Sequence, residues 1–120
     1  MRLNRGRLWE ERAAAYLEDC GLTVLARGYR CRLGEIDLVC RDDPHLVIVE
    51  VRARGSSALC SAVDSIGAAK RRRIVLATRH LLMTHGEWHA APIRFDVVAF
   101  DAIDSAEPQI RWIKNAFDGS

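Results

Sequence analysis

Two carboxylates stand in segments that are otherwise typical of buried strands. Asp37 lies inside the segment GEIDLV, and Glu50 directly follows the apolar run 46–49. Removing a carboxylate from water is unfavourable unless a cation or hydrogen bonds compensate, so each acid needs a partner. If the two strands are neighbours, the acids repel each other, and a divalent cation would relieve that repulsion. Oxygen ligands suit Mg²⁺ or Mn²⁺, whereas no His or Cys spacing in the chain suits zinc.

A third acid, Glu10, belongs to the first amphipathic segment. Its neighbours at i+3, i+4 and i+7 are Ala13, Ala14 and Leu17, which places it at the edge of the core-facing stripe of a helix. From that edge Glu10 can reach the cluster that contains Asp37. Three acids therefore form the candidate metal site.

An ion-pair interpretation of the same acids stays open. Asp37 and Glu50 would then pair with arginines and bind no metal. The candidate partners are Arg30, Arg52 and Arg94. Asp96 alternates with apolar residues next to Arg94, and this pattern is more typical of a paired structural acid than of a metal ligand.

Basic residues gather in two parts of the chain, although the net charge is only +2. Residues 1–32 hold seven arginines against four acids, and residues 68–80 hold five basic residues against none. The second group includes the uninterrupted run Lys70, Arg71, Arg72 and Arg73. Such a run is by default a solvated helix face. Beside a carboxylate cluster it also predicts contact with nucleic-acid phosphates.

The elements that must position these residues follow from the apolar pattern. It predicts a helix over about 3–20, strands over about 22–32, 35–41, 46–54 and 93–101, and a second helix over about 62–83. A Gly/Ser-rich loop spans 55–61, and the apolar run 110–113 is a candidate fifth strand. Short breaks predict an antiparallel meander of the first three strands. The order αβββαβ indicates an α/β fold with a mixed sheet.

Alternation along the second strand assigns side chains to faces. Asp37 then points to one face of the sheet. The residues expected on the opposite face are Ile36, Leu38 and Cys40. By the same count Glu50 shares a face with Ile48 and Arg52.

The composition predicts a single globular domain over residues 1–120. The chain has 120 residues, of which 49% are hydrophobic and 28% charged, enough for one core and too few for two. No run approaches the roughly 18 apolar residues of a membrane span, and no hydrophobic stretch makes a secretory signal. The four cysteines show no CxxC pair and are expected to be free thiols. We expect a cytoplasmic protein that does not enter a membrane.

Four segments of the chain, in this order, carry a resemblance to a known family. They are EERAAAYLEDCGLTVLARGYRCRLGEIDLV, LVIVEVRAR, AAKRRRI and RFDVV. They resemble the YraN-like family of uncharacterised bacterial proteins, within the PD-(D/E)XK nuclease-like superfamily and similar to archaeal Holliday-junction resolvases. The resemblance implies a restriction-endonuclease-like αβββαβ core, with a mixed central sheet flanked by helices.

The resemblance also implies roles for single residues. Glu10, Asp37 and Glu50 would hold Mg²⁺ or Mn²⁺ for the hydrolysis of a phosphodiester, in DNA by similarity to the resolvases. The superfamily usually has a lysine two residues after the Glu, but this chain has Arg52, which cannot act as a base. Lys70 matches a lysine that recurs in the family and is the candidate for the missing ammonium group; otherwise it is a surface lysine.

Three functions stay open because of this departure. The first is a divalent-metal-dependent endonuclease, and the second is a non-catalytic module that binds nucleic acid. The third is a protein-interaction domain whose basic surface binds an acidic partner. The predicted phosphate contacts are Arg52, Arg54, Lys70, Arg71, Arg72 and Arg73. Resolvase-like relatives form dimers, so the resemblance also predicts a homodimer. A further departure is Gly28, where the family usually has asparagine.

Overall fold

The structure, a computed structural model, describes residues 5–119, which contain five strands and two helices. The elements are α1 Arg5–Asp19, β1 Thr23–Cys31, β2 Gly34–Asp42, β3 His45–Ala53, α2 Ala68–Thr84, a 3-10 turn Gly86–Trp88, β4 Ile93–Asp101 and β5 Gln109–Phe117. The predicted start of the first helix at residues 3 and 4 lies outside the described residues. The predicted order of elements is confirmed, and the candidate fifth strand is present as β5.

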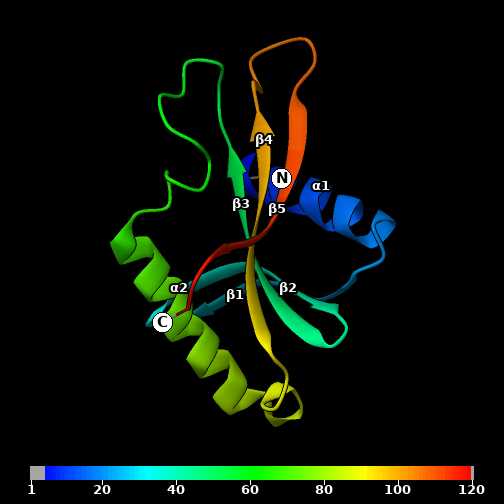
Figure 1. Ribbon diagram of the computed structural model, residues 1–120, viewed down its shortest axis with the longest axis vertical. Coiled ribbons are helices and arrows are strands. Elements are labelled where there is room, and N and C mark those ends of the chain that lie inside the picture. Colours follow the sequence, from blue (N-terminus) through cyan, green and yellow to red (C-terminus); the bar gives the residue numbers. More distant parts are fainter. Residues whose placement is uncertain (1–4, 120) are drawn as a thin grey trace.

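The five strands form one mixed sheet in the order β1-β2-β3-β4-β5 (Figure 1). The first three strands make the predicted antiparallel meander, β4 runs parallel to β3, and β5 returns antiparallel to β4. Parallel neighbours need a long crossover connection, and α2 lies in the one between β3 and β4. The prediction of an α/β fold with a mixed sheet is therefore confirmed.

Helix α1 covers one face of the sheet. Ala13, Ala14 and Leu17 are fully buried and belong to a cluster with Leu38 and Val49 of the sheet. Small side chains at two of these positions allow the helix to approach the strands closely. This packing fixes the position of α1, and with it the position of any acid at the edge of its buried stripe.

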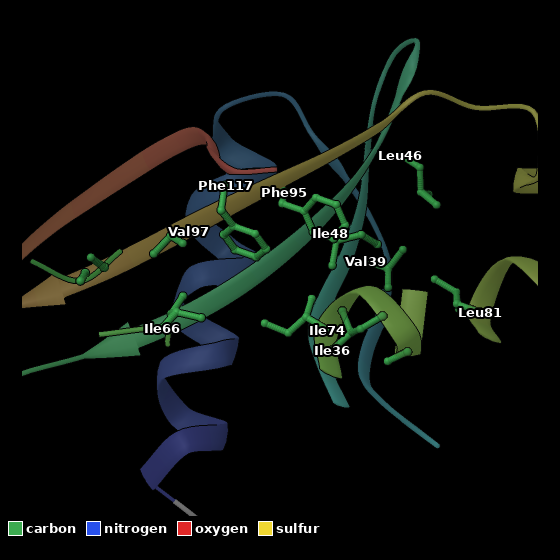
Figure 2. Packing of buried hydrophobic residues seen from close by; sticks show 13 residues of the cluster. Ile36, Val39, Leu46, Ile48, Ile66, Ile74, Leu81, Phe95, Val97 and Phe117 are labelled. Carbon is green, nitrogen blue, oxygen red and sulfur yellow. The ribbon is translucent and has the colours of Figure 1, made fainter. Parts of the chain in front are cut away.

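Helix α2 covers the opposite face (Figure 2). Its buried residues Ile74, Ala77 and Leu81 pack with Ile36 and Ile48 of the sheet. Full burial of a side chain of this size stabilises the fold by roughly 1.5–3 kcal/mol. Each face of the sheet is thus covered by one of the two described helices.

The start of α2 differs from the prediction. The helix begins at Ala68 and not near residue 62, because Gly67 before it is extended, with φ −71° and ψ 170°. Residues 62–66 form turns, yet Ala62 and Ile66 are buried in the core. Their apolar spacing is typical of a helix, but here it comes from a loop packed onto the sheet.

A buried acid joins β4 to β5. Asp96 is fully buried and accepts hydrogen bonds from Arg94 Nε at 2.9 Å, Trp112 Nε1 at 2.9 Å and the backbone N–H of Asn115 at 2.9 Å. Its interpretation as a paired structural acid is confirmed. Asn115 has φ +52°, close to a register shift in the β4–β5 pairing, and asparagine tolerates this left-handed conformation. Across residues 5–119, no helix is long and apolar enough to cross a membrane.

Candidate functional site

The two strand carboxylates lie where the β2–β3 ladder ends. Backbone pairing of these strands runs from Asp42 opposite His45 to Leu38 opposite Val49. One step further, Val51 N–H donates to Asp37 Oδ2 at 2.8 Å, and Asp37 N–H donates to Glu50 Oε2 at 3.3 Å. The two carboxylates thus accept hydrogen bonds from backbone amides that would have paired with the neighbouring strand if the ladder had continued. Each amide orients one carboxylate oxygen.

The alternation of β2 changes phase at Asp37. Ile36 and Val39 belong to the core on the α2 face, whereas Leu38 and Cys40 belong to the core on the α1 face. The prediction that Ile36 shares a face with Leu38 and Cys40 is therefore wrong. Strict alternation would have put residues three apart on opposite faces. A local irregularity in the strand places Asp37 at the step between the two faces.

Glu50 is a buried carboxylate beside an ammonium group. It is 1% exposed, on the face of Ile48 as predicted, and Lys70 Nζ lies 3.9 Å from its Oε1. Burial, and then the charge of Asp37, raise the pKa of Glu50 to about 8. The hydrogen bond from the Asp37 backbone and the charges of Lys70 and Arg52 act in the opposite direction. Glu50 therefore keeps its proton to a higher pH than an ordinary carboxyl group does.

Glu10 reaches the same cluster from α1. Burial raises its pKa to about 7, and a side-chain hydrogen bond with Asp37 and the charge of Asp37 add to the effect. The structure thus brings Glu10 to Asp37, and Asp37 to Glu50. Among residues 5–119, however, no three His, Cys, Asp or Glu side chains are already grouped closely enough to hold a metal ion. The three acids form a chain of contacts.

The chemistry of these donors fits Mg²⁺ or Mn²⁺. Asp37 and Glu50 each give one oxygen to a backbone amide and keep a second oxygen for another partner. Hard carboxylate oxygens are the ligands that both cations prefer. Carboxyl groups that retain protons because of burial and mutual repulsion would release them to a divalent cation.

The ion-pair interpretation predicted three arginine partners for Asp37 and Glu50. In the described part of the chain, none of these arginines forms a salt bridge with either acid. Their partners are Glu35 for Arg30, Ser65 for Arg52, and Asp42 and Asp96 for Arg94. The cation next to the pair is Lys70.

Three of the predicted phosphate contacts hold the loop between β3 and α2. Arg52 donates to Ser65 Oγ at 3.1 Å and to Ser65 O at 3.0 Å. Arg71 donates to Ile66 O at 2.8 Å and to a second loop carbonyl at 3.1 Å, and Arg54 donates to the carbonyl of Cys60. These guanidinium groups are already engaged by the protein.

The remaining predicted contacts lie at the start of α2. Gly67 offers no side-chain cap, and the first turn contains no acid. The positive end of the helix dipole therefore coincides with basic side chains, including the exposed Arg72 and Arg73. A cavity of about 320 Å³, the Lys70 cavity, opens here; its lining residues are Gly34, Glu35, Lys70, Arg73 and Ile74.

A second cavity borders Glu10 and contains arginines that were not predicted from the sequence as phosphate contacts. Its volume is about 520 Å³, and its lining contains three arginines, Arg7, Arg27 and Arg30, together with three acids, Glu10, Glu11 and Glu35. The excess of arginine in residues 1–32 was the signal, but composition does not say which of these side chains converge. We call this cavity the arginine pocket.

Comparison with known sequences decides the family. Residues 9–100 match the uncharacterised protein family UPF0102. The chain belongs to this family. A UPF0102 protein of Nitrosomonas europaea is 46% identical over 118 residues, which cover 98% of this chain and 96% of that protein. A UPF0102 protein of Pseudomonas aeruginosa is 43% identical over 116 residues, covering 96% and 93%. One of Legionella pneumophila is 40% identical over 118 residues, covering 98% of each.

The match to UPF0102 includes the candidate site. Residues 9–100 contain Glu10, Asp37, Glu50 and Lys70 and end before β5. The prediction of an uncharacterised family is thereby confirmed as UPF0102. Membership of the nuclease-like superfamily stays a prediction.

Proposed function

We propose that this UPF0102 protein is a divalent-metal-dependent nuclease that hydrolyses phosphodiester bonds in DNA. One observation carries the proposal: the β2–β3 ladder ends at Asp37 and Glu50, so that two carboxylates meet beside the ammonium group of Lys70. A mixed sheet with a helix on each face is compatible with a restriction-endonuclease-like fold, which we include in the proposal.

Asp37 and Glu50, with Glu10, would hold Mg²⁺ or Mn²⁺. Such a cation lowers the pKa of a bound water and stabilises charge on the phosphate oxygens. The backbone amides of Val51 and Asp37 fix one oxygen of each strand carboxylate, so the ligands are oriented before binding. Glu10 comes from α1, and a small movement of this helix would bring its carboxylate to the same cation.

Lys70 would supply the ammonium group of the site. Its Nζ lies 3.9 Å from Glu50 Oε1, although it comes from α2 and not from β3. From there it can orient a water molecule or neutralise charge on the phosphate. Arg52, two residues after Glu50, is hydrogen-bonded to Ser65, and a guanidinium group does not act as a base.

The start of α2 would bind the DNA backbone. Arg72 and Arg73 are exposed next to Lys70, at a helix terminus whose dipole favours anions. Phosphate contacts of this kind are independent of base sequence, and they weaken as salt is raised.

A second candidate function is a non-catalytic module that binds nucleic acid. The observation that favours it is the side chain of Arg52, which the loop holds through Ser65. Such a module would keep the basic surface and use the acids only for structure. A protein-interaction domain would use the same basic surface for an acidic partner.

Cleavage assays separate these functions. Purified protein is incubated with Mn²⁺ and linear duplex, single-stranded or four-way-junction DNA. We expect cleavage of at least one substrate by the wild type, and a rate at least about 100-fold lower for Asp37→Asn or Glu50→Gln, because loss of even outer-shell groups reduces metal-dependent activity by up to about this factor. Asp43→Asn is the matched control, since this acid is 85% exposed.

The other outcomes are equally informative. Undiminished cleavage by Asp37→Asn would contradict the assignment of the site and point to a contaminating nuclease. Binding of DNA by the wild type without cleavage would favour the non-catalytic module. Loss of activity in Lys70→Ala, with metal binding retained, is the result expected if Lys70 supplies the ammonium group.

A further inference from the structure

We propose that the arginine pocket is a second phosphate-binding site, in which Arg27 and Arg30 hold the DNA strand on the side of the carboxylates away from the Lys70 cavity. The inference rests on the proposed function and deepens it, because it names the kind of substrate. A site with phosphate contacts on both sides of the reacting bond requires a polynucleotide and discriminates against mononucleotides.

The pocket is an open cavity and not a flat surface. It has a volume of about 520 Å³ and lies between α1, which contributes Arg7 and Glu10, and β1, which contributes Arg27 and Arg30. Gly28 also lines it, and no atom lies within 4 Å of where its Cβ would be. A backbone without a side chain at this point leaves room for a sugar-phosphate chain.

The two β1 arginines are available for an anion. Arg27 is paired with Glu18 at 3.6 Å and Arg30 with Glu35 at 3.6 Å, with arginine side chains 51% and 76% exposed. Exposed pairs of this length contribute little to stability, so either guanidinium can exchange a carboxylate for a phosphate. Arginine is also the residue whose planar fork matches phosphate oxygens in a bidentate arrangement.

The arginine pocket and the Lys70 cavity meet at Glu35, which lines both. One contains Arg27 and Arg30, and the other contains Lys70. Glu10 also lines the arginine pocket. A phosphodiester chain that passes from one cavity to the other therefore runs past Glu35 and Glu10. Glu35 would repel the phosphates of this chain. Removing its charge should therefore strengthen DNA binding, whereas removing the arginines should weaken it.

The test measures DNA binding at several salt concentrations. The probes are a fluorescent 20-nucleotide single strand and its duplex, without divalent cation, so that no cleavage occurs. For Arg27→Gln/Arg30→Gln we expect at least about tenfold weaker binding, and a plot of log affinity against log salt that is shallower by about two units. Glu35→Gln should bind more tightly than the wild type. The matched control is Arg41→Gln, an exposed arginine paired with Asp43 at 3.7 Å near the other end of β2.

Further variants and readouts keep the inference falsifiable. The charge-retaining variant Arg27→Lys/Arg30→Lys should recover the wild-type salt dependence, and Mn²⁺ binding without DNA should be unchanged in both double variants. Unchanged DNA affinity and slope in the glutamine variant, with binding lost in Arg72→Gln/Arg73→Gln, would overturn the inference and leave the proposed function standing. Failure of the wild type to bind either probe would overturn both.

Discussion

The ionisation of Glu50 makes the stability of the protein depend on pH. Its carboxyl is buried, and its pKa is raised from an ordinary value of 4.5 to about 8. The folded protein thus holds this proton more tightly than the unfolded chain does. The resulting stabilisation is fully present below pH 4.5 and is lost as the pH rises through about 8.

Replacing Glu50 with glutamine should therefore flatten the dependence of stability on pH. Between pH 5 and 8.5 the wild type is expected to lose a few kcal/mol of unfolding free energy through this group, whereas Glu50→Gln loses much less. Urea denaturation at several pH values measures the difference, with Asp43→Asn as the exposed control. Parallel pH profiles for the wild type and Glu50→Gln would show that this carboxyl is not perturbed by burial.

Gly28 has a conformational reason for its identity. It has φ +63° and faces Asp37, between the pairs Arg27 opposite Leu38 and Tyr29 opposite Ile36. Apart from glycine, asparagine is among the residues that adopt this conformation most readily. The family that the sequence resembles usually has asparagine at this position. The same left-handed backbone conformation would explain that residue.

Two substitutions at Gly28 separate conformation from crowding. Space around the position is open, so any loss of stability must come from the backbone. We expect Gly28→Val to lower the unfolding free energy by about 1–3 kcal/mol and Gly28→Asn to lower it by less than about 1 kcal/mol. Thermal or urea denaturation measures both. Equal losses in the two variants would contradict this explanation.

The loop between β3 and α2 is held by arginines of the two elements that it connects, Arg52 of β3 and Arg71 of α2. Arg52 and Arg71 bind carbonyls of residues 63–66, and Asp104 of the β4–β5 connection accepts two hydrogen bonds from Ser56, each 2.7 Å long. In Figure 1 the loop and the β4–β5 hairpin project at the same end of the molecule. The loop is thus an ordered part of the surface beside the site.

Removal of one anchor should loosen the loop. In Arg71→Ala we expect faster hydrogen exchange of the amides of residues 55–66 and a loss of about 1–2 kcal/mol in stability, because two carbonyls lose a charged donor. The neighbouring Arg72→Ala removes an exposed arginine and is the matched control. If both variants exchange at the same rate, Arg71 is not an anchor.

The boundaries of the first four strands could be predicted from the apolar runs and the breaks between them, but some other element ends could not. Residues 62–66 have the apolar spacing of a helix, and only the extended backbone of Gly67 shows that α2 starts later. The fifth strand, predicted over 110–113, extends over Gln109–Phe117 because Asn115 accommodates an irregularity and bonds to Asp96. Such long-range partners are not visible in a local pattern.

In the molecule as a whole, the acids of the candidate site could be predicted from the sequence, whereas the roles of most arginines could not. Asp37 and Glu50 stood out because charge is unfavourable within apolar strands. Exposed or half-exposed arginines carry no such signal, so the partners of Arg52 and Arg71, and the convergence of Arg27 with Arg30, depend on tertiary structure. The fold brings α1, β2, β3 and α2 to one site, and each contributes one residue of the proposed machinery.

Calorimetric titration tests whether Asp37 and Glu50 bind Mn²⁺. At pH 7 in buffers of different ionisation enthalpy, we expect the wild type to bind Mn²⁺ with release of protons, because the pKa is raised to about 8 for Glu50 and to about 7 for Glu10 in the free protein. Asp37→Asn/Glu50→Gln should bind at least about tenfold more weakly, a loss of about 1.4 kcal/mol or more, and Asp43→Asn should match the wild type. Equal binding of Mn²⁺ by the wild type and the double variant, or no binding by the wild type, would contradict the proposed metal site.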